Sequence, residues 1–98
     1  MTANDRVAAI ADEVIGWRHR IHADPELGFQ EHRAAAFVAE RLRGFGLEVH
    51  TDVSATAVVG VLRRGTGGRS LALRAELDAL PIQEAADVPY ASRNPGVM

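Results

Sequence analysis

Two carboxylates spaced two residues apart, Glu76 and Asp78, are the strongest candidates for chemistry in this sequence. They follow the apolar run Ser70 to Ala75, which we expect to be a strand, so both side chains would point the same way at its end. Open α/β sheets place their ligand crevices at such strand ends. The pair could bind or orient a metal ligand, or share a proton. The alternative is a solvated strand end with a turn-forming Asp.

Two histidines three residues apart, His19 and His22, form a second candidate site on the first expected helix. This spacing places them on neighbouring positions of one face, where a metal-binding pair is conceivable. Arg18 and Arg20 flank them on the polar side of the helix, so we favour a solvent-exposed surface. The other histidines have no partner at metal-ligand spacing and are also assigned to the surface: His32 and His50.

Other catalytic patterns are missing from the sequence. The glycine-rich run 65–68 lacks the lysine of a phosphate-binding loop and no helix follows it, so we expect a hairpin connection. Gly44 and Gly46 do not follow a strand and instead predict a helix end. No serine lies in a nucleophile elbow. The chain contains no cysteine, which excludes disulfides and thiolate chemistry.

Composition narrows the class of protein and its partners. The 98 residues are 47% hydrophobic with a net charge of −2, which suits one small domain or part of a larger one. All eleven basic residues are arginines spread along the chain, so we expect no nucleic-acid partner. No apolar run is long enough for a membrane span, and acidic residues interrupt any signal peptide. The default expectation is a cytoplasmic protein.

The elements that must position these residues follow from the hydrophobic periodicity. Residues from about Asn4 to His22 predict a helix with Asn4 or Asp5 as the cap, and Asp24-Pro25 ends it. Its apolar face is expected to comprise Val7, Ile10, Val14, Trp17 and Ile21. A second helix is expected from about Gln30 to Arg43. Its buried stripe would comprise Ala34, Phe37, Val38, Leu42 and Phe45.

The pattern then changes to that of strands. Leu47 to Val53 alternates and predicts a half-buried strand, whereas Ala57 to Leu62 is continuously apolar and predicts a strand covered on both faces. Ser70 to Ala75 would be the third. Residues 82–98 have no clear period and are expected to form a long loop, which is typical of a chain that continues. The expected fold class is α/β, with two helices and then three strands.

Several strings give a more specific identification. Arg18 to Phe29 followed by Glu31, Val58 to Leu62, and Leu73 to Pro81 resemble successive motifs of aminoacylase-like metallo-amidohydrolases. The resemblance is to the hippurate hydrolase and indole-acetyl-amino-acid hydrolase group. The strings Pro89 to Ser92 and Pro95 to Met98 also fit. All of them occur in family order and spacing and cover about Val14 to Met98.

The resemblance implies a zinc-peptidase-like catalytic domain with a mixed sheet between helices, and an inserted lid or dimerisation domain. Residues 1–98 would be the N-terminal part of that catalytic domain. It implies hydrolysis of N-acyl amino acids or related amides by two divalent metals, zinc or manganese, with a glutamate as general base. A homodimer is possible in the parent enzyme. In the family the metal ligands begin after a segment like Gly96 to Met98, so none is expected in this chain.

Within that resemblance, Asp78 matches the second Asp of the family signature, where it orients a metal ligand. Glu76 stands where this group usually has Asp and related peptidases have a metal-binding His. Ala55-Thr56-Ala57 replaces a usual Gly-Thr-Gly.

Two hypotheses about function follow. The first is an inactive fragment of an amidohydrolase, which retains Asp78 and Glu76 but not the metal ligands. The second is a self-contained, non-enzymatic interaction module that keeps the start of the fold. A His- and Cys-rich run in the coding DNA after Met98 would favour the first, and a stable fold with a defined partner would favour the second.

Overall fold

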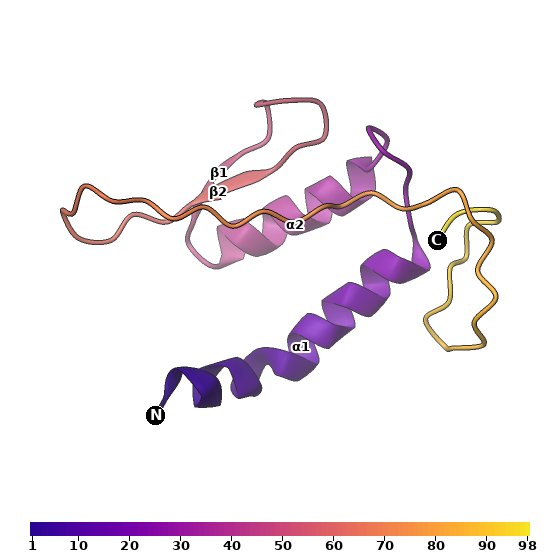
Figure 1. Cartoon of the computed structure of the whole chain (residues 1–98), viewed down its shortest axis with the longest axis horizontal. Coiled ribbons are helices and arrows are strands. Elements are labelled where there is room, and N and C mark those ends of the chain that lie inside the picture. Colours follow the sequence, from indigo (N-terminus) through magenta and orange to yellow (C-terminus); the bar gives the residue numbers. More distant parts are fainter. The chain divides into compact units, whose positions relative to one another are not determined.

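The computed structural model describes all 98 residues and contains two helices followed by one antiparallel hairpin (Figure 1). The elements are α1 (Ala3–Ala23), α2 (His32–Gly44), β1 (Glu48–His50) and β2 (Val59–Val61). The chain divides into two compact units. We call residues 1–25 with 80–98 the helix–loop unit and residues 26–79 the helix–hairpin unit.

The N-terminal cap of helix α1 lies earlier in the sequence than predicted. Thr2 is the cap: its hydroxyl accepts a hydrogen bond from the Asp5 amide, while the Asp5 carboxylate accepts from the Thr2 amide at 2.9 Å. This reciprocal arrangement is a capping box. The prediction of Asn4 or Asp5 as the cap was therefore wrong by two or three residues, because Asp5 contributes from the first turn instead.

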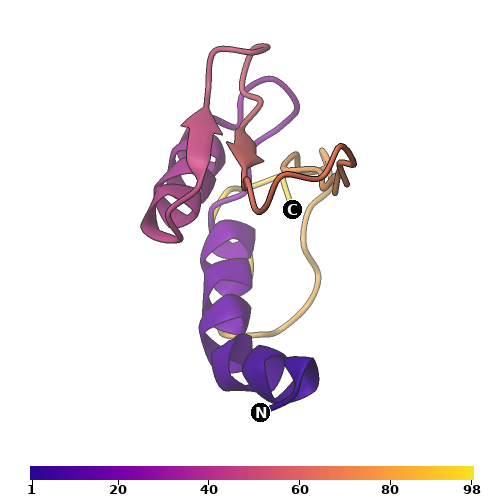
Figure 2. The same cartoon turned by 90° about the vertical axis from the view of Figure 1, so that its left-hand side faces the viewer.

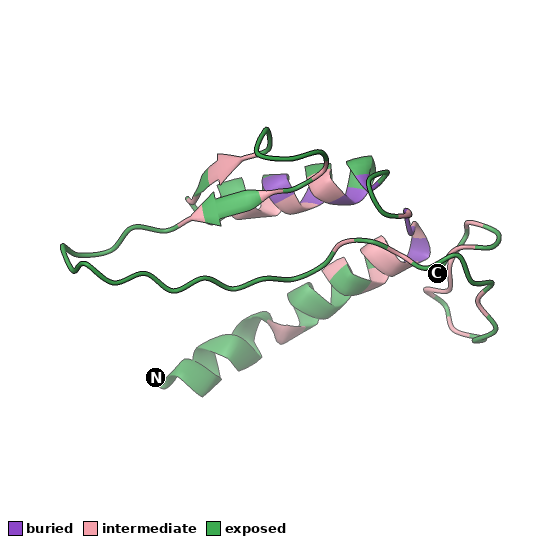
Figure 3. Ribbon diagram, turned by 45° about the horizontal axis from the view of Figure 1, so that its top comes forward, coloured by how far each residue is buried: buried purple, intermediate pink, exposed green.

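The apolar face predicted for α1 is largely uncovered in this structure. Val7, Ile10 and Val14 are 64%, 48% and 44% exposed, whereas Trp17 and Ile21 are half-buried. Figure 3 shows that burial on α1 increases toward its C-terminal end. The periodicity thus predicted the helix correctly, but three of the five residues of its apolar stripe are exposed.

Residues 80–98 form an irregular segment, as expected, yet hydrogen bonds fix it within the helix–loop unit. Leu80 and Met98 exchange two backbone hydrogen bonds of 2.8 and 3.0 Å, which close the segment into a loop. The Arg93 amide donates to the Ala23 carbonyl at 2.9 Å. Because this segment contains no helix or strand, these bonds provide partners for some of its backbone N–H and C=O groups.

Helix α2 provides most of the buried apolar surface of the helix–hairpin unit. Ala34, Phe37 and Ala39 are buried, and α2 covers one face of the β1–β2 hairpin (Figure 2). Val38 and Leu42 are half-buried. The prediction that Phe45 is buried was wrong: it is 58% exposed, because it caps the helix and already belongs to the following turn.

The hairpin pairs Glu48 with Val61 and His50 with Val59 in antiparallel register. The half-buried strand expected in Leu47 to Val53 is present as β1, though shorter. The expectation that Ala57 to Leu62 is covered on both faces was wrong. Val59 is 39% and Leu62 63% exposed, since β2 has one strand neighbour and one helix cover.

The α/β class is confirmed, but the expected third strand is not formed. The run Ser70 to Ala75 belongs to no strand, and Leu71 and Leu73 are 89% and 92% exposed. No strand of the structure pairs with it, so its apolar side chains have nothing to pack against. The expected hairpin connection at 63–69 consequently leads into an extended segment rather than a strand.

Candidate functional site

Asp78 lies in a short backbone pairing with the turn that precedes α2. The Ala79 amide donates to the Glu26 carbonyl at 2.8 Å, and Leu27 and Ala79 form an isolated parallel bridge. The Asp78 Oδ2 atom is 3.9 Å from where a Cβ would stand on Gly28. The carboxylate is exposed. The structure therefore holds the backbone next to Asp78 while leaving its carboxylate accessible.

Glu76 has different neighbours from Asp78. Its carboxylate is 3.3 Å from the Arg74 guanidinium, and its side chain is 66% exposed. An exposed ion pair of this kind contributes little to stability. Glu76 and Asp78, which were predicted to act together, therefore have different neighbours. The structure shows no contact between the two carboxylates through which they would share a proton.

The turn between Leu27 and Gln30 carries a backbone outlier beside this pairing. Phe29 has a φ of 64°, in the left-handed region that non-glycine residues rarely adopt, and its side chain is 78% exposed. The Gln30 amide closes the turn on the Leu27 carbonyl at 2.9 Å. This tight turn directs the chain from Glu26 into α2.

Two buried carboxylates near the start of α2 were missed by the sequence analysis. Glu26 and Glu31 are each 8% exposed. Glu26 accepts hydrogen bonds from the amides of Arg33 and Ala34, whereas Glu31 accepts from the Gln30 amide and the Thr56 hydroxyl. A sequence signal did exist, because α2 begins without Ser, Thr, Asp or Asn at its cap and therefore needs another acceptor.

The two candidate histidines of α1 do not form a metal pair. The His22 Nε2 atom lies 2.9 and 3.1 Å from the two carboxylate oxygens of Glu84, and the His19 ring stacks on Tyr90 with centroids 3.7 Å apart. Both histidines are half-buried. The surface assignment was therefore wrong, because residues 84–92 of the same unit cover this face of α1.

Glu84 is a carboxyl of the helix–loop unit that is engaged by both α1 and the loop. Its side chain is 5% exposed and accepts a hydrogen bond from the Ser92 amide at 2.6 Å. That bond, followed by the contact with His22, lowers the pKa of the Glu84 carboxyl below its usual value. These contacts serve to hold the loop, and they place no free base toward solvent.

No group of three or more His, Asp or Glu side chains in the chain is arranged to hold a metal ion. Asp78 offers one exposed carboxylate, which is enough to support a ligand but not to bind a metal tightly. The residues present therefore do not fit a complete metal site. Neither helix is both long and apolar enough to cross a membrane.

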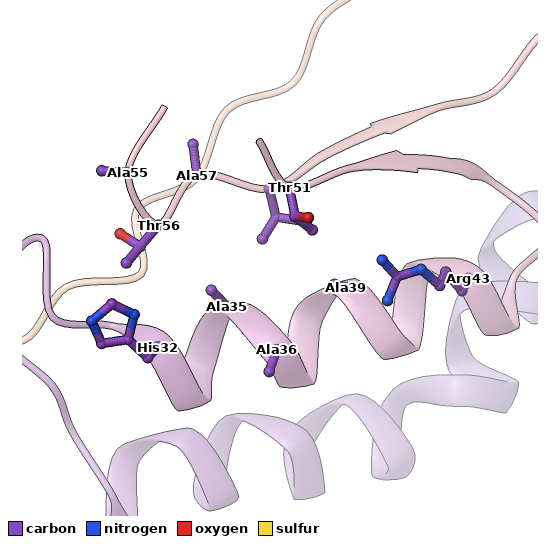
Figure 4. Close-up of a pocket in the computed structure, with 10 residues that line it drawn as sticks. His32, Ala35, Ala36, Ala39, Arg43, Thr51, Ala55, Thr56 and Ala57 are labelled. Atoms are coloured by element: carbon purple, nitrogen blue, oxygen red, sulfur yellow. The ribbon is translucent and has the colours of Figure 1, made fainter. Parts of the chain in front are cut away.

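A groove of about 340 Å³ runs between α2 and residues 51–58 in the helix–hairpin unit (Figure 4). Alanines line the α2 side, with His32 and Arg43 at opposite ends, and Thr51 and Thr56 face them from the other side. His32 is exposed, as expected. The groove contains no pair of residues suited to acid–base or nucleophilic catalysis.

Comparison with known proteins agrees with the resemblance seen in the motifs. The chain is 48% identical over 81 residues to a hippurate hydrolase of Campylobacter jejuni, covering 83% of this chain and 21% of that protein. It is 46% identical over 95 residues to an N-acyl-L-amino acid amidohydrolase of Geobacillus stearothermophilus, covering 94% and 25%. No protein-family model matches the chain.

A solved structure shares the fold. A dinuclear metal-binding peptidase of the M20 family from Bacillus subtilis superimposes with a TM-score of 0.85 at 32% identity, covering 93% of this chain and 26% of that one. The chain thus spans about a fifth to a quarter of the length of these relatives. In sequence and fold it corresponds to the N-terminal segment of the aminoacylase- and hippurate-hydrolase-type metallo-amidohydrolases of the M20 family, and it belongs to that family.

Proposed function

We propose that residues 1–98 form the N-terminal part of the catalytic domain of an enzyme that hydrolyses the amide bond of N-acyl amino acids or related amides. The observation that carries this proposal is the presentation of Asp78: an exposed carboxylate next to a backbone hydrogen bond, within the Leu73 to Pro81 motif. The names of the matched relatives, a hippurate hydrolase and an N-acyl-L-amino acid amidohydrolase, support the same substrate class.

In this proposal Asp78 orients a metal ligand rather than binding the metal. A carboxylate that accepts the second ring N–H of a metal-bound histidine fixes its tautomer and raises its basicity. Zinc or manganese would supply Lewis acidity and an activated water. Because Glu76 is paired with Arg74 at the surface, we assign it a weaker, electrostatic role. A small-molecule substrate, a cytoplasmic location and a homodimeric parent enzyme complete the proposal.

A segment exchange tests the role of Asp78. Residues 18–98 would replace the matching segment of the Campylobacter jejuni hippurate hydrolase, and hippurate hydrolysis and bound metal would be measured. We expect an active chimera, and we expect Asp78→Asn to lower activity or metal affinity by about 10–100-fold, as loss of such a support does elsewhere.

Glu76→Gln is the matched control in the same chimera, because it removes a neighbouring carboxylate that is already paired. We expect its effect to be less than about threefold, in line with the small value of exposed ion pairs. A folded, metal-loaded chimera in which Asp78→Asn is as active as the parent would refute the proposed role.

For the 98-residue chain alone we expect neither hydrolysis of N-acyl amino acids nor stoichiometric metal. Elemental analysis of protein purified with added zinc or manganese gives the metal content, and a hippurate assay gives the activity. About one tightly held metal per chain would contradict this expectation, since metal affinity depends on a preformed ligand set.

A further inference from the structure

We propose that Glu26 is a positioning residue for Asp78, because one residue joins the start of α2 to the backbone that carries the Asp78 carboxylate. The inference bears on the proposed function, in which Asp78 orients a metal ligand. Its geometry, however, lies wholly within the helix–hairpin unit and can be tested without metal or substrate.

The side chain of Glu26 is fixed on α2. Its Oε1 atom accepts from the Ala34 amide at 2.8 Å and its Oε2 atom from the Arg33 amide at 3.1 Å. The Arg33 guanidinium lies 3.7 Å from the same Oε2 atom. With 6% of the side chain exposed, these partners replace the water that a carboxylate otherwise requires.

Helix α2 depends on this carboxylate for its N-terminal cap. The residue at the cap position, Glu31, makes no side-chain capping bond, because its carboxylate is engaged by the Gln30 amide and the Thr56 hydroxyl. The first-turn amides of a helix need acceptors, and a negative charge there also interacts favourably with the helix dipole. Glu26 supplies both, from outside the helix.

The main chain of Glu26 is fixed on the Asp78 segment. Its carbonyl accepts from the Ala79 amide at 2.8 Å, and the next residue, Leu27, forms the parallel bridge with Ala79. This is the only ladder-type pairing that residues 70–79 make, since the run before it belongs to no strand. The direction of the backbone at Asp78 therefore depends on where Glu26 stands.

The two ends of Glu26 are coupled by its own short side chain. If its carboxylate leaves α2, the carbonyl that receives the Ala79 amide loses its fixed position. Phe29 adds to this constraint, because the left-handed turn at φ 64° is maintained only while its flanks are held. Charge-assisted bonds are about twice as strong as neutral ones, so neutralising Glu26 should loosen both ends.

The experiment is amide hydrogen exchange by NMR on the 98-residue chain and its Glu26→Gln variant. We expect exchange of the Arg33, Ala34 and Ala79 amides to become about tenfold faster, the change expected for loss of one charge-assisted bond. The Asp78 carboxyl carbon should shift in the same variant. Glu26→Asp, which keeps the charge but shortens the side chain, should give intermediate rates.

Glu31→Gln is the matched control, because Glu31 is equally buried but contacts Thr56 instead of Ala79. We expect it to change Ala79 exchange by less than about twofold. The proposal is overturned if Glu26→Gln speeds only the α2 amides, if Glu31→Gln affects Ala79 equally, or if Ala79 is unprotected in the unsubstituted chain. None of these readouts uses metal or activity, so their failure is distinguishable from failure of the chimera experiment.

Discussion

Different kinds of interaction stabilise the interior of each of the two units. In the helix–hairpin unit, apolar side chains of α2 are buried, namely Ala34, Phe37 and Ala39. In the helix–loop unit, named polar contacts join α1 to the loop, such as the 2.9 Å pair of His22 with Glu84. Apolar contacts are non-directional and insensitive to pH, whereas buried polar pairs respond to both geometry and protonation. Substitutions should therefore affect the two units differently.

The largest effect is expected from Phe37→Ala, which removes the largest buried side chain of the helix–hairpin unit. Phe37 is 8% exposed, so the substitution leaves a cavity and should lower the free energy of unfolding by about 3 kcal/mol. Urea denaturation followed by far-UV circular dichroism measures this change.

Phe45→Ala is the control for that prediction, because Phe45 has the same chemistry but is 58% exposed. We expect a loss of at most about 0.5 kcal/mol, as for most surface substitutions. If the two variants lose the same free energy of unfolding, burial of the Phe37 side chain does not contribute more to stability than the exposed Phe45 side chain.

A smaller effect is expected from Gly60→Ala in β2. A Cβ there would stand 2.9 Å from Leu47 Cδ2 and 3.1 Å from Leu42 Cδ1, so both leucines must shift. We expect a loss of about 1–2 kcal/mol, the usual cost of overpacking. Gly67→Ala is the control, since a Cβ at Gly67 meets nothing within 4 Å; a similar loss there would contradict the packing argument.

A gain in stability is expected from Ala55→Gly. Ala55 has a φ of 37°, which strains a residue with a Cβ, and glycine is the residue that the related Gly-Thr-Gly motif has there. Relief of strain minus the added chain entropy should stabilise the chain by about 0.5–1 kcal/mol. Ala57→Gly, where φ is not positive, should instead destabilise it. A thermal melt that ranks the two variants in the opposite order would refute this explanation.

The sequence predicts an element well where the local pattern of residues determines it. It predicts an element poorly where residues distant in the sequence must pair with it. The two helices follow from periodicity and were placed within two residues. The run Ser70 to Ala75 has a strand-like pattern, but a strand exists only where another strand pairs with it, and none does here. Likewise, Val59 in β2 is apolar without being covered. An apolar composition predicts that a segment prefers to be buried. It does not predict which other segment, if any, packs against it.

The candidate site shows the same division. Asp78 was identified from the motif, and its position at the end of the apolar run follows from the chain itself. The contacts of Glu26 with α2 and with Ala79 join residues 7 to 53 positions apart, so no local pattern predicts them. His22 was assigned to the surface because Arg18 and Arg20 flank it, and no local pattern could reveal its partner Glu84, 62 residues away in the sequence.

The smallest effect is expected from Glu84→Gln in the helix–loop unit, and it should shrink as the pH falls, because glutamine resembles the protonated form of Glu84. A glutamine oxygen can still accept the 2.6 Å bond from the Ser92 amide, so the contact survives in neutral form. In the parent chain, the Ser92 amide and His22 lower the pKa of the Glu84 carboxyl below 4.5. On acidification, the Glu84 carboxyl is therefore protonated at a higher pH in the unfolded chain than in the folded chain.

The stabilisation from Glu84 is therefore present above about pH 4.5 and lost as the pH falls through the lowered pKa. Glu84→Gln should flatten the dependence of the unfolding midpoint on pH below the usual carboxyl pKa of about 4.3. Some acid sensitivity should remain, because the capping box also lowers the pKa of Asp5. Asp87→Asn, at an exposed position, is the control. If both variants keep the parent's pH dependence, polar contacts do not hold the loop to α1, and the contrast between the two units fails.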